Sequence, residues 1–530
     1  MKTAIVSVFA TMLLASVAAA AQVDPIATEG GLVDGVTLES GVRAWLGVPF
    51  AAPPVRELRW RPPQPMPKWR GVLHAERAAP MCLQSIRTRT MNHYFGNEAI
   101  SEDCLYLNIW SPTGASRLPV IVWIYGGGFN VGSASMANYS GEGLAQKGVV
   151  RVNLAYRVGA LGFFAHPELT RESGTGASGN YGLMDQVAGL EWVKRNIAAF
   201  GGDPDNVTIA GQSAGSTSVA LLQMSPAAKG LLHKVVGMSG SPFGEPMSLA
   251  PLARAEAEGL ALQNALGAKS IEGLRDIGGD RIIAVNVPRS SVVIDGRYVI
   301  GPARDTFATN RQSDVPVMMG FTRDESFRPL GDINSVGDYE TAVQAHFPAN
   351  AASVLAAYPA TDVASARRAA VDVGRDASLG LRMAQWALAQ AQFGKAPVYP
   401  YFFTRRQPYA PGITFIDHDP ANAGAYHTGE VPYFLRTRES LNLFRQTRNW
   451  EPVDARLEDD MSGLLLSFAR NGVPVSPRVP QWPRFDARRP RVVSLGEEIR
   501  VVDWPNYKTL TLLDSPLPPP RPAAPNRARD

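Results

Sequence analysis

The chain has 530 residues and a formal net charge of +4 at pH 7, and 45% of its residues are hydrophobic while 19% are charged. This composition predicts a large buried core, and the length fits either one large α/β domain or two to three average domains. The small net charge and the lack of a long Lys/Arg block argue against nucleic acid as a partner.

The N-terminus has the order of features that marks a secretory signal peptide. Lys2 precedes an apolar run from Ala4 to about Val17, and small residues then lead to an Ala-x-Ala cleavage site near residue 21. The run is shorter than the ~20 residues that span a bilayer, and no stop-transfer segment follows it. We therefore expect residues 1–21 to be removed, giving a secreted or periplasmic protein without a membrane span.

The chain contains two cysteines, Cys82 and Cys104. An even number of cysteines in an exported protein favours a disulfide. This bond would close a loop of roughly twenty residues and contribute about 3 kcal/mol of stability by the chain-entropy model. Two free thiols, or one reactive cysteine, are the alternative.

The next segments alternate between strand and helix patterns. The run PVIVWIY at 119–125 is typical of a strand buried on both faces of a parallel sheet, and 149–157 resembles a second strand. Apolar residues at helical spacing over 182–200 predict a helix, with basic residues near its end, where the helix dipole favours them. After a turn at 201–206, VTIA at 207–210 predicts another strand. This alternation favours an α/β fold.

Three successive glycines follow the first of these strands, in YGGGF at 125–129. Glycine has no Cβ, so this backbone can turn its amide hydrogens toward a substrate carbonyl. Together with the amide of Ala214, the amides of Gly127 and Gly128 would form an oxyanion hole with three donors. A flexible glycine loop is the alternative.

The strand at 207–210 runs into AGQSAGS, in which Ser213 lies between Gly211 and Gly215. The Gly-x-Ser-x-Gly pattern alone occurs by chance, but here it joins a strand to a segment that is apolar at helical spacing. That order is the context of a nucleophile elbow, in which glycines allow close approach of strand and helix. We therefore predict that Ser213 is an activated nucleophile.

These segments resemble the type-B carboxylesterases, the cholinesterase-like branch of the α/β-hydrolases. FGGDPDNVTIAGQSAGS at 200–216 is similar to that family's nucleophile signature, although the family usually has glutamate at Gln212. EDCLYLNIWSP at 102–112 is similar to its other signature, which contains a disulfide cysteine. The resemblance runs from LGVPFAAPP at 46–54 to NGVPVSPRVPQWPRFD at 471–486. It implies an α/β-hydrolase domain at 22–513, with a large mixed, mainly parallel central sheet flanked by helices and a helical cap over an active-site gorge.

A serine nucleophile needs a histidine base, and in α/β-hydrolases the order along the chain is serine, acid, histidine. The four histidines beyond the elbow are His233, His346, His418 and His427. AGAYHTGEVPYFL at 423–435 resembles the family's base loop, which favours His427, although Thr428 stands where glycine is usual. His418, between two acids, is the alternative, while His233 and His346 fit structural roles.

VPVMMGFTRDESF at 315–327 resembles the strand and Asp-Glu-Gly turn that carry the family's acid. By that correspondence Glu325 is the acid, Asp324 is a surface charge or turn former, and Ser326 replaces glycine. The implied triad of serine, glutamate and histidine needs no metal or organic cofactor. The sequence also has no His-Glu-x-x-His, Walker or paired-cysteine metal motif.

In cholinesterases, the loop closed by the matching disulfide holds a tryptophan that binds a quaternary ammonium by a cation–π contact. This chain has no tryptophan there. The side chains of the loop that suit ester recognition are instead Arg87, Arg89, Tyr94 and Phe95. This disfavours choline esters and is compatible with anionic or polycarboxylic esters, with a solvated arginine loop as the alternative.

The sequence therefore predicts a secreted serine carboxylesterase that hydrolyses a small-molecule ester through an acyl-enzyme. The alternatives are a lipase, an amidase, a toxin or polycarboxylate esterase of the same fold, and a binding protein without catalysis. Residues 514–530 are rich in proline and basic, which predicts a disordered tail. No feature of the sequence indicates the oligomeric state.

Overall fold

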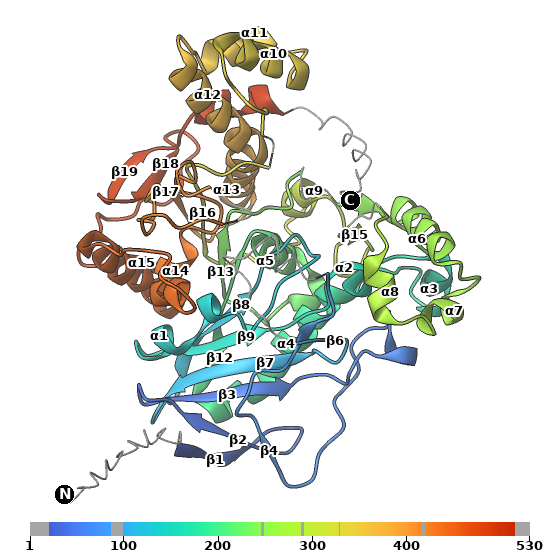
Figure 1. Cartoon of the computed structure of the whole chain (residues 1–530). Coiled ribbons are helices and arrows are strands. Elements are labelled where there is room, and N and C mark those ends of the chain that lie inside the picture. Colours follow the sequence, from blue (N-terminus) through green and yellow to red (C-terminus); the bar gives the residue numbers. More distant parts are fainter. Residues whose placement is uncertain are drawn as a thin grey trace, which may run out of the picture.

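We describe the fold from a computed structural model of the chain, shown in Figure 1. The structure describes residues 21–85, 99–244, 249–287, 291–327, 329–415 and 419–514. Several predictions lie outside these residues: nearly all of the signal peptide, the tail beyond Asp514, the alternative base His418, and the four loop side chains Arg87, Arg89, Tyr94 and Phe95.

One large sheet of 13 strands organises the described part of the chain. Its strands are β1 (Ala21–Ala27), β2 (Leu32–Thr37), β3 (Val42–Pro49), β4 (Val72–His74), β7 (Tyr106–Pro112), β8 (Leu118–Ile124), β9 (Val150–Leu154), β12 (Gly202–Gln212), β13 (Lys234–Met238), β16 (Val317–Thr322), β17 (Val398–Phe403), β18 (Arg491–Leu495) and β19 (Arg500–Asp503). Short pairs are β5 (Met81–Cys82) with β6 (Ile100–Ser101), β10 (Phe163–Phe164) with β11 (Gly179–Asn180), and β14 (Ala250–Pro251) with β15 (Val293–Ile294).

The strand order is β1-β2-β3-β7-β9-β8-β12-β13-β16-β17-β18-β19, with β4 paired to β2. Along this order, all neighbours from β9 to β18 are parallel. The outer strands β1, β2, β3, β7 and β19 pair in antiparallel fashion. The predicted mixed, mainly parallel sheet is confirmed.

The apolar runs identified in the sequence form the centre of this sheet. The run at 119–125 becomes β8, in which every side chain from Val120 to Ile124 has 0% exposure. The run at 149–157 contains β9. The turn expected at 201–206 is instead the extended start of β12, and its pairing with β8 is interrupted between Gly202 and Val207. Pro204 lies in this interruption and has no N–H to donate to a neighbouring strand.

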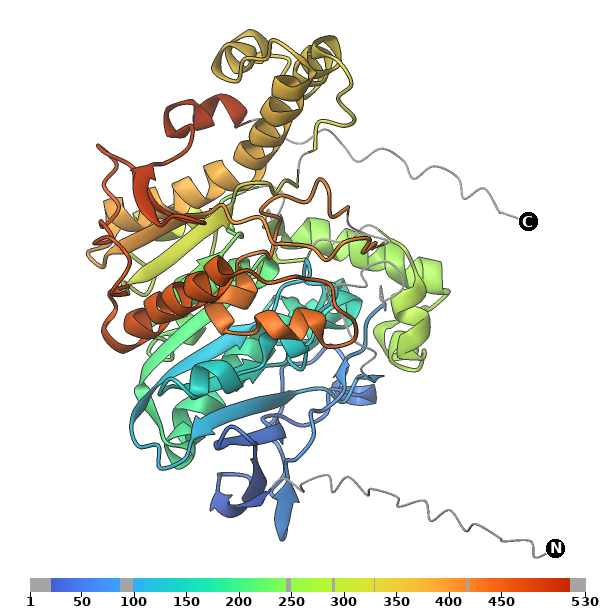
Figure 2. The same cartoon turned by 60° about the vertical axis from the view of Figure 1, so that its left-hand side comes forward.

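Helices surround the sheet. They are α1 (Glu142–Ala145), α2 (Gly159–Gly162), α3 (Pro167–Glu172), α4 (Tyr181–Asn196), α5 (Ala214–Met224), α6 (Leu252–Leu266), α7 (Ile271–Arg275), α8 (Gly279–Ala284), α9 (Ala303–Ala308), α10 (Val336–His346), α11 (Ala351–Ala357), α12 (Val363–Arg375), α13 (Leu381–Phe393), α14 (Val431–Leu435) and α15 (Pro452–Asn471). Figure 2 shows α14 and α15 in front of the sheet. Helix α5 packs on β12 and β13, and α13 packs on β16 and β17.

The chain between β13 and β17 is mainly helical, as expected for a cap. Helices α6–α8 and α10–α12 form two groups outside the layer that contacts the sheet (Figures 1 and 2). The second group has its own hydrophobic core, which includes Tyr339, Val343 and Phe347. Within the described residues, no helix is both long and apolar enough to cross a bilayer. A disulfide joins Cys82 to Cys104 and so ties β5 to the segment before β7.

Candidate active site

Ser213 lies at the sharp turn between β12 and α5, with φ 58° and ψ −124°. A Cβ at Gly211 would overlap the carbonyl of Gly215, and a Cβ at Gly215 would overlap the carbonyl oxygen of Ile124. The two glycines are therefore required because strand and helix touch each other directly. This is the strained strand–turn–helix geometry of a nucleophile elbow, as the sequence pattern predicted.

The glycine loop after β8 lies against this turn. A Cβ at Gly126 would be only 3.0 Å from the Cβ of Ser213. Gly127 and Gly128 have φ values of 112° and 62°, which glycine adopts with little strain. Among the described residues, the N–H groups of Gly127, Gly128 and Ala214 have no protein acceptor. Unpaired amide donors beside a serine hydroxyl are what an oxyanion hole requires.

Glu325 and His427 form a close pair. His427 Nδ1 is 2.5 Å from Oε2 of Glu325, whose side chain is buried in the turn after β16. The other carboxylate oxygen, Oε1, accepts hydrogen bonds from the Thr322 amide at 2.7 Å and from the Ser239 hydroxyl at 2.9 Å. These two donors fix the carboxylate, which in turn fixes the orientation of the imidazole.

Asp324 has the structural role of a turn former, which is one of the two roles expected for it. It is half-buried rather than a surface charge, and it accepts hydrogen bonds from the Ala425 amide at 2.7 Å and from the guanidinium of Arg323 at 2.9 Å. Arg368 also contacts it, at 2.5 Å. Burial alone would raise the pKa of Asp324, but these hydrogen bonds outweigh burial and lower it. Asp324 thus anchors the loop that carries His427.

The two departures from the family pattern near these residues differ in their effect on the backbone. Thr428 has φ 93°, a conformation that a β-branched residue rarely adopts and that glycine adopts easily. The turn is nevertheless kept, because the amide of Val431 donates to the Thr428 carbonyl at 3.1 Å. Ser326 does not have a positive φ, so its position does not need glycine.

Comparisons with known proteins identify the family of the chain. The model of the Carboxylesterase family matches residues 22–510. The chain belongs to the carboxylesterase family. It is 37% identical over 486 residues to the fumonisin B1 esterase of Sphingopyxis macrogoltabida, covering 89% of this chain and 86% of that protein. It is 32% identical to the cocaine esterase of Homo sapiens, covering 86% of this chain and 84% of that protein.

A solved structure of PNB esterase has the same fold as this carboxylesterase. The TM-score is 0.77 at 29% identity, and the match covers 93% of this chain and 99% of that one. The para-nitrobenzyl esterase of Bacillus subtilis is 31% identical, over 91% of this chain and 96% of its own. The α/β-hydrolase fold predicted from the sequence is therefore confirmed, and the protein is a carboxylic ester hydrolase.

Gln212, which precedes the serine in this carboxylesterase, contacts the candidate base His427 directly. Its Nε2 is 3.1 Å from Nε2 of His427. The amide group can donate to the lone pair of a neutral imidazole and, turned by 180°, can accept from an imidazolium. A glutamate at this position, as is usual in the family, could only accept. Gln212 therefore suits both protonation states of His427.

We predict that Gln212→Glu moves the acidic limb of the rate–pH profile to higher pH by about one unit. An anion this close to Nε2 favours the imidazolium, which cannot accept the serine proton. The measurement is kcat/KM for a neutral ester from pH 5 to 9. Gln223→Glu would be an unsuitable control, because Gln223 is fully buried. Gln385→Glu, at a half-buried position of α13, is the better control and should leave the limb in place.

Sequence reasoning missed a second buried carboxyl group, Glu430, behind the acid. Its Oε1 is 3.3 Å from the Ser239 hydroxyl and 3.4 Å from the Tyr401 hydroxyl, while Oε2 has no partner among the described residues. Complete burial and then the negative charge of Glu325 raise the pKa of Glu430 to about 8. The raised pKa favours the protonated form of Glu430 near neutral pH. In the sequence, the only signal that could have identified Glu430 is its position three residues after His427.

Glu430→Gln should reduce a loss of stability that we expect for the enzyme between about pH 5 and pH 8. The folded-state pKa lies above the unfolded value, so the folded state binds more protons in this range and its stability falls as pH rises. The contribution of this group is on the order of 3 kcal/mol, and the amide of glutamine does not titrate. Urea unfolding at several pH values measures it.

The matched control for this experiment is Glu439→Gln, because Glu439 is exposed in the same part of the chain. That variant should keep the pH dependence of the wild type. An unchanged slope in Glu430→Gln would show that Glu430 is ionised in the folded enzyme.

The other candidate histidines that the structure describes, His233 and His346, have structural contacts. His233 Nδ1 accepts from the Val207 amide at 3.1 Å, and His346 Nδ1 lies 2.9 Å from the Ala342 carbonyl oxygen. Both interactions are with the backbone, as expected for residues outside the reaction.

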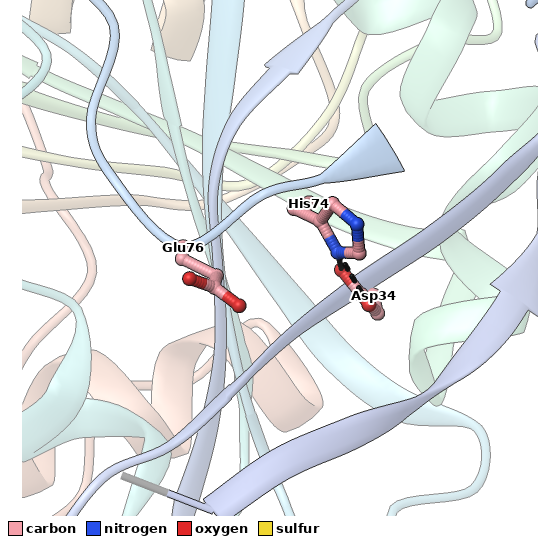
Figure 3. Close-up of side chains that lie close together, drawn as sticks. All are labelled: Asp34, His74 and Glu76. Atoms are coloured by element: carbon pink, nitrogen blue, oxygen red, sulfur yellow. Dashed lines mark hydrogen bonds and ion pairs between the residues drawn. The ribbon is translucent and has the colours of Figure 1, made fainter. Parts of the chain in front are cut away.

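A further group of titratable side chains consists of Asp34 on β2, His74 at the end of β4 and Glu76 just after β4 (Figure 3). His74 Nδ1 is 2.9 Å from Asp34 Oδ2, and the carboxylate of Glu76 lies within 4.8 Å of both. Four strands, β3, β7, β9 and β8, separate β2 from β12 in the sheet. At about 4.8 Å per strand, the group is on the order of 20 Å or more from the elbow. The hydrogen-bonded pair of His74 and Asp34, with Glu76 beside it, lies apart from the candidate active site.

Proposed function

We propose that this carboxylesterase is a secreted serine esterase that forms an acyl-enzyme on Ser213. The observation that carries this proposal is the position of His427. Its Nδ1 is paired with the buried carboxylate of Glu325 at 2.5 Å, while its Nε2 is 3.1 Å from the side chain next to the serine. The imidazole thus lies between an acid and the nucleophile elbow, as a catalytic base must.

The reaction follows from these positions. The Ser213 hydroxyl attacks the ester carbonyl while His427 takes its proton at Nε2, and Glu325 stabilises the imidazolium. The amides of Gly127, Gly128 and Ala214 donate to the oxyanion. The alcohol then leaves with the proton from His427. Water repeats the same steps on the acyl-enzyme and releases the acid, with the serine hydroxyl restored.

Labelling with a fluorophosphonate probe tests this assignment. Fluorophosphonates react with a serine that is activated as a nucleophile, so one adduct should form and peptide mapping should place it on Ser213. Prior incubation with an ester substrate should slow the labelling. An adduct on a different serine would contradict the proposed site.

Secretion is supported by two features of the chain. Residues 1–21 have the pattern of a signal peptide, and the Cys82–Cys104 disulfide suits an oxidising compartment. We propose a mature enzyme with a hydrolase domain at 22–513 and a proline-rich tail at 514–530. N-terminal sequencing of protein recovered from outside the cytoplasm would test the cleavage, with Ala21 or Gln22 expected as the first residue.

A second candidate concerns the substrate. Hydrolysis of fumonisin B1 is favoured by the 37% identity to the fumonisin B1 esterase of Sphingopyxis macrogoltabida. A related possibility from the sequence is a polycarboxylate ester bound by Arg87 and Arg89. A panel of neutral and carboxylate-bearing esters, with fumonisin B1 included, separates these cases. Equal rates for both ester classes before and after Arg87→Ala with Arg89→Ala would count against anion recognition.

A further inference from the structure

A second concave site runs along α13, apart from the candidate active site. It is a groove of about 650 Å³, which is the size of a small-molecule pocket. Helix α13 contacts α9 and the short helix η7 (Tyr507–Leu513), and residues of all three line the groove. None of the residues that line it belongs to the proposed triad or the glycine loop.

The floor of the groove is apolar. It is formed mainly by Phe243, Leu381, Ala384, Leu388, Tyr507 and Leu510. Leu388 is 37% exposed, which is unusual for a large aliphatic side chain on a helix that packs on the sheet. A hydrocarbon chain placed here would remove this surface from water, with a gain of roughly 25 cal/mol for each Å² buried.

The charged residues of the groove are all basic. Arg304, Arg488 and Lys508 line it, whereas no aspartate or glutamate does. All three are exposed, and none of them forms an ion pair with a carboxylate of the described residues. By contrast, Arg382 on the same helix pairs with Asp514 at 2.8 Å. An apolar floor with three unpaired cations matches the two parts of an amphiphilic anion.

We propose that this groove binds a carboxylate with a single hydrocarbon chain. The chain would lie on the apolar floor, and the carboxylate would be held by Arg304, Arg488 and Lys508, since guanidinium groups pair well with carboxylates. This inference goes beyond the proposed esterase reaction and does not depend on Ser213. A carboxylate is nevertheless the class of product that ester hydrolysis releases, so the enzyme meets such ligands during turnover.

The protein's own C-terminal segment is a less suitable occupant. The described chain ends at Asp514, next to the groove, and residues 515–530 follow. These sixteen residues contain three arginines and one aspartate. Residues 515–530 and the groove both carry net positive charge and therefore repel each other, whereas a carboxylate is attracted to the groove.

Binding of dodecanoate to the full-length mature enzyme, measured by isothermal titration calorimetry, tests the proposal. Dodecanoate should bind at low ionic strength and more weakly with added salt, because exposed charges are screened. The triple variant Arg304→Gln, Arg488→Gln, Lys508→Gln should weaken binding about tenfold, since each exposed ion pair contributes a modest amount. Leu388→Asp, which places an acid on the floor, should weaken it further. Hydrolysis of p-nitrophenyl acetate should be unchanged in these variants.

Three controls make the result decisive. The variant Lys269→Gln, Arg297→Gln, Arg311→Gln removes the same charge from exposed positions outside the groove and should bind dodecanoate like the wild type. Dodecyltrimethylammonium, with the same chain and the opposite charge, should bind at least tenfold more weakly. Equal binding of the two amphiphiles, or an unchanged Kd in the groove variants, would overturn the proposal. The proposal would also be overturned if dodecanoate bound to a variant truncated after residue 514 but not to the full-length chain. The tail would then occupy the groove in the full-length chain.

Discussion

Ser213→Ala is expected to lower kcat for p-nitrophenyl acetate by about 10⁴- to 10⁶-fold while leaving the enzyme folded. The variant keeps the elbow and the amide donors but has no oxygen that can attack the ester. The remaining rate would come from binding and from the oxyanion donors alone, through direct attack by water. Steady-state kinetics on highly purified protein measure the loss, and the far-UV circular dichroism spectrum reports on the fold.

The matched control for this change is Ser225→Ala. Ser225 is also buried, and its hydroxyl has no partner among the described residues, so its removal should leave kcat within about twofold of the wild type. Substantial activity in Ser213→Ala, in a preparation free of wild-type enzyme, would refute the proposed nucleophile.

Glu325→Gln should lower kcat by about 10³- to 10⁴-fold, because it acts on the base rather than on the fold. The amide of glutamine can donate to Nδ1 of His427, which stabilises the tautomer whose proton is on Nε2 and which cannot accept the serine proton. The negative charge that stabilises the imidazolium is lost as well. The Thr322 amide and the Ser239 hydroxyl can still donate to the glutamine oxygen, so the turn should keep its shape.

Asp324→Asn separates this chemical role from a positional one. Asp324 anchors the base loop through the Ala425 amide, whereas Glu325 pairs with the imidazole itself. Its variant should lose stability by about 1 kcal/mol, with an effect on kcat far smaller than that of Glu325→Gln. Similar losses of kcat in the two variants would indicate that Glu325, too, acts mainly by holding the loop.

The centre of the fold could be predicted from the sequence because its signals are local. A run such as 119–125 is apolar throughout, as a strand with both faces buried must be, and the glycine spacing around Ser213 reflects a contact between adjacent elements. Helix α5, directly after the serine, is buried along its whole length, so its apolar character was also visible. The antiparallel outer strands carry weaker hydrophobic patterns, which do not identify these segments as strands.

The candidate acid and base were found by family resemblance, since neither has a local pattern of its own. His427 lies in a turn, and its role depends on Glu325, which is 102 residues earlier in the chain. The contact between Gln212 and His427, and the burial of Glu430 against Glu325, arise only when distant segments meet. For Asp324, the place in a turn was predictable, whereas its burial was not, because Arg323, Arg368 and the base loop cover it.

The wide spacing of these groups along the chain has a consequence for the kinetics of refolding. Gln212 and His427 are 215 residues apart, and the candidate acid Glu325 lies in the turn after β16, which must pair with both β13 and β17. Such long-range parallel pairing is slow compared with helix formation. Esterase activity should therefore return after most of the helical circular dichroism signal during refolding. An activity assay would then report completion of the central sheet rather than the first collapse of the chain.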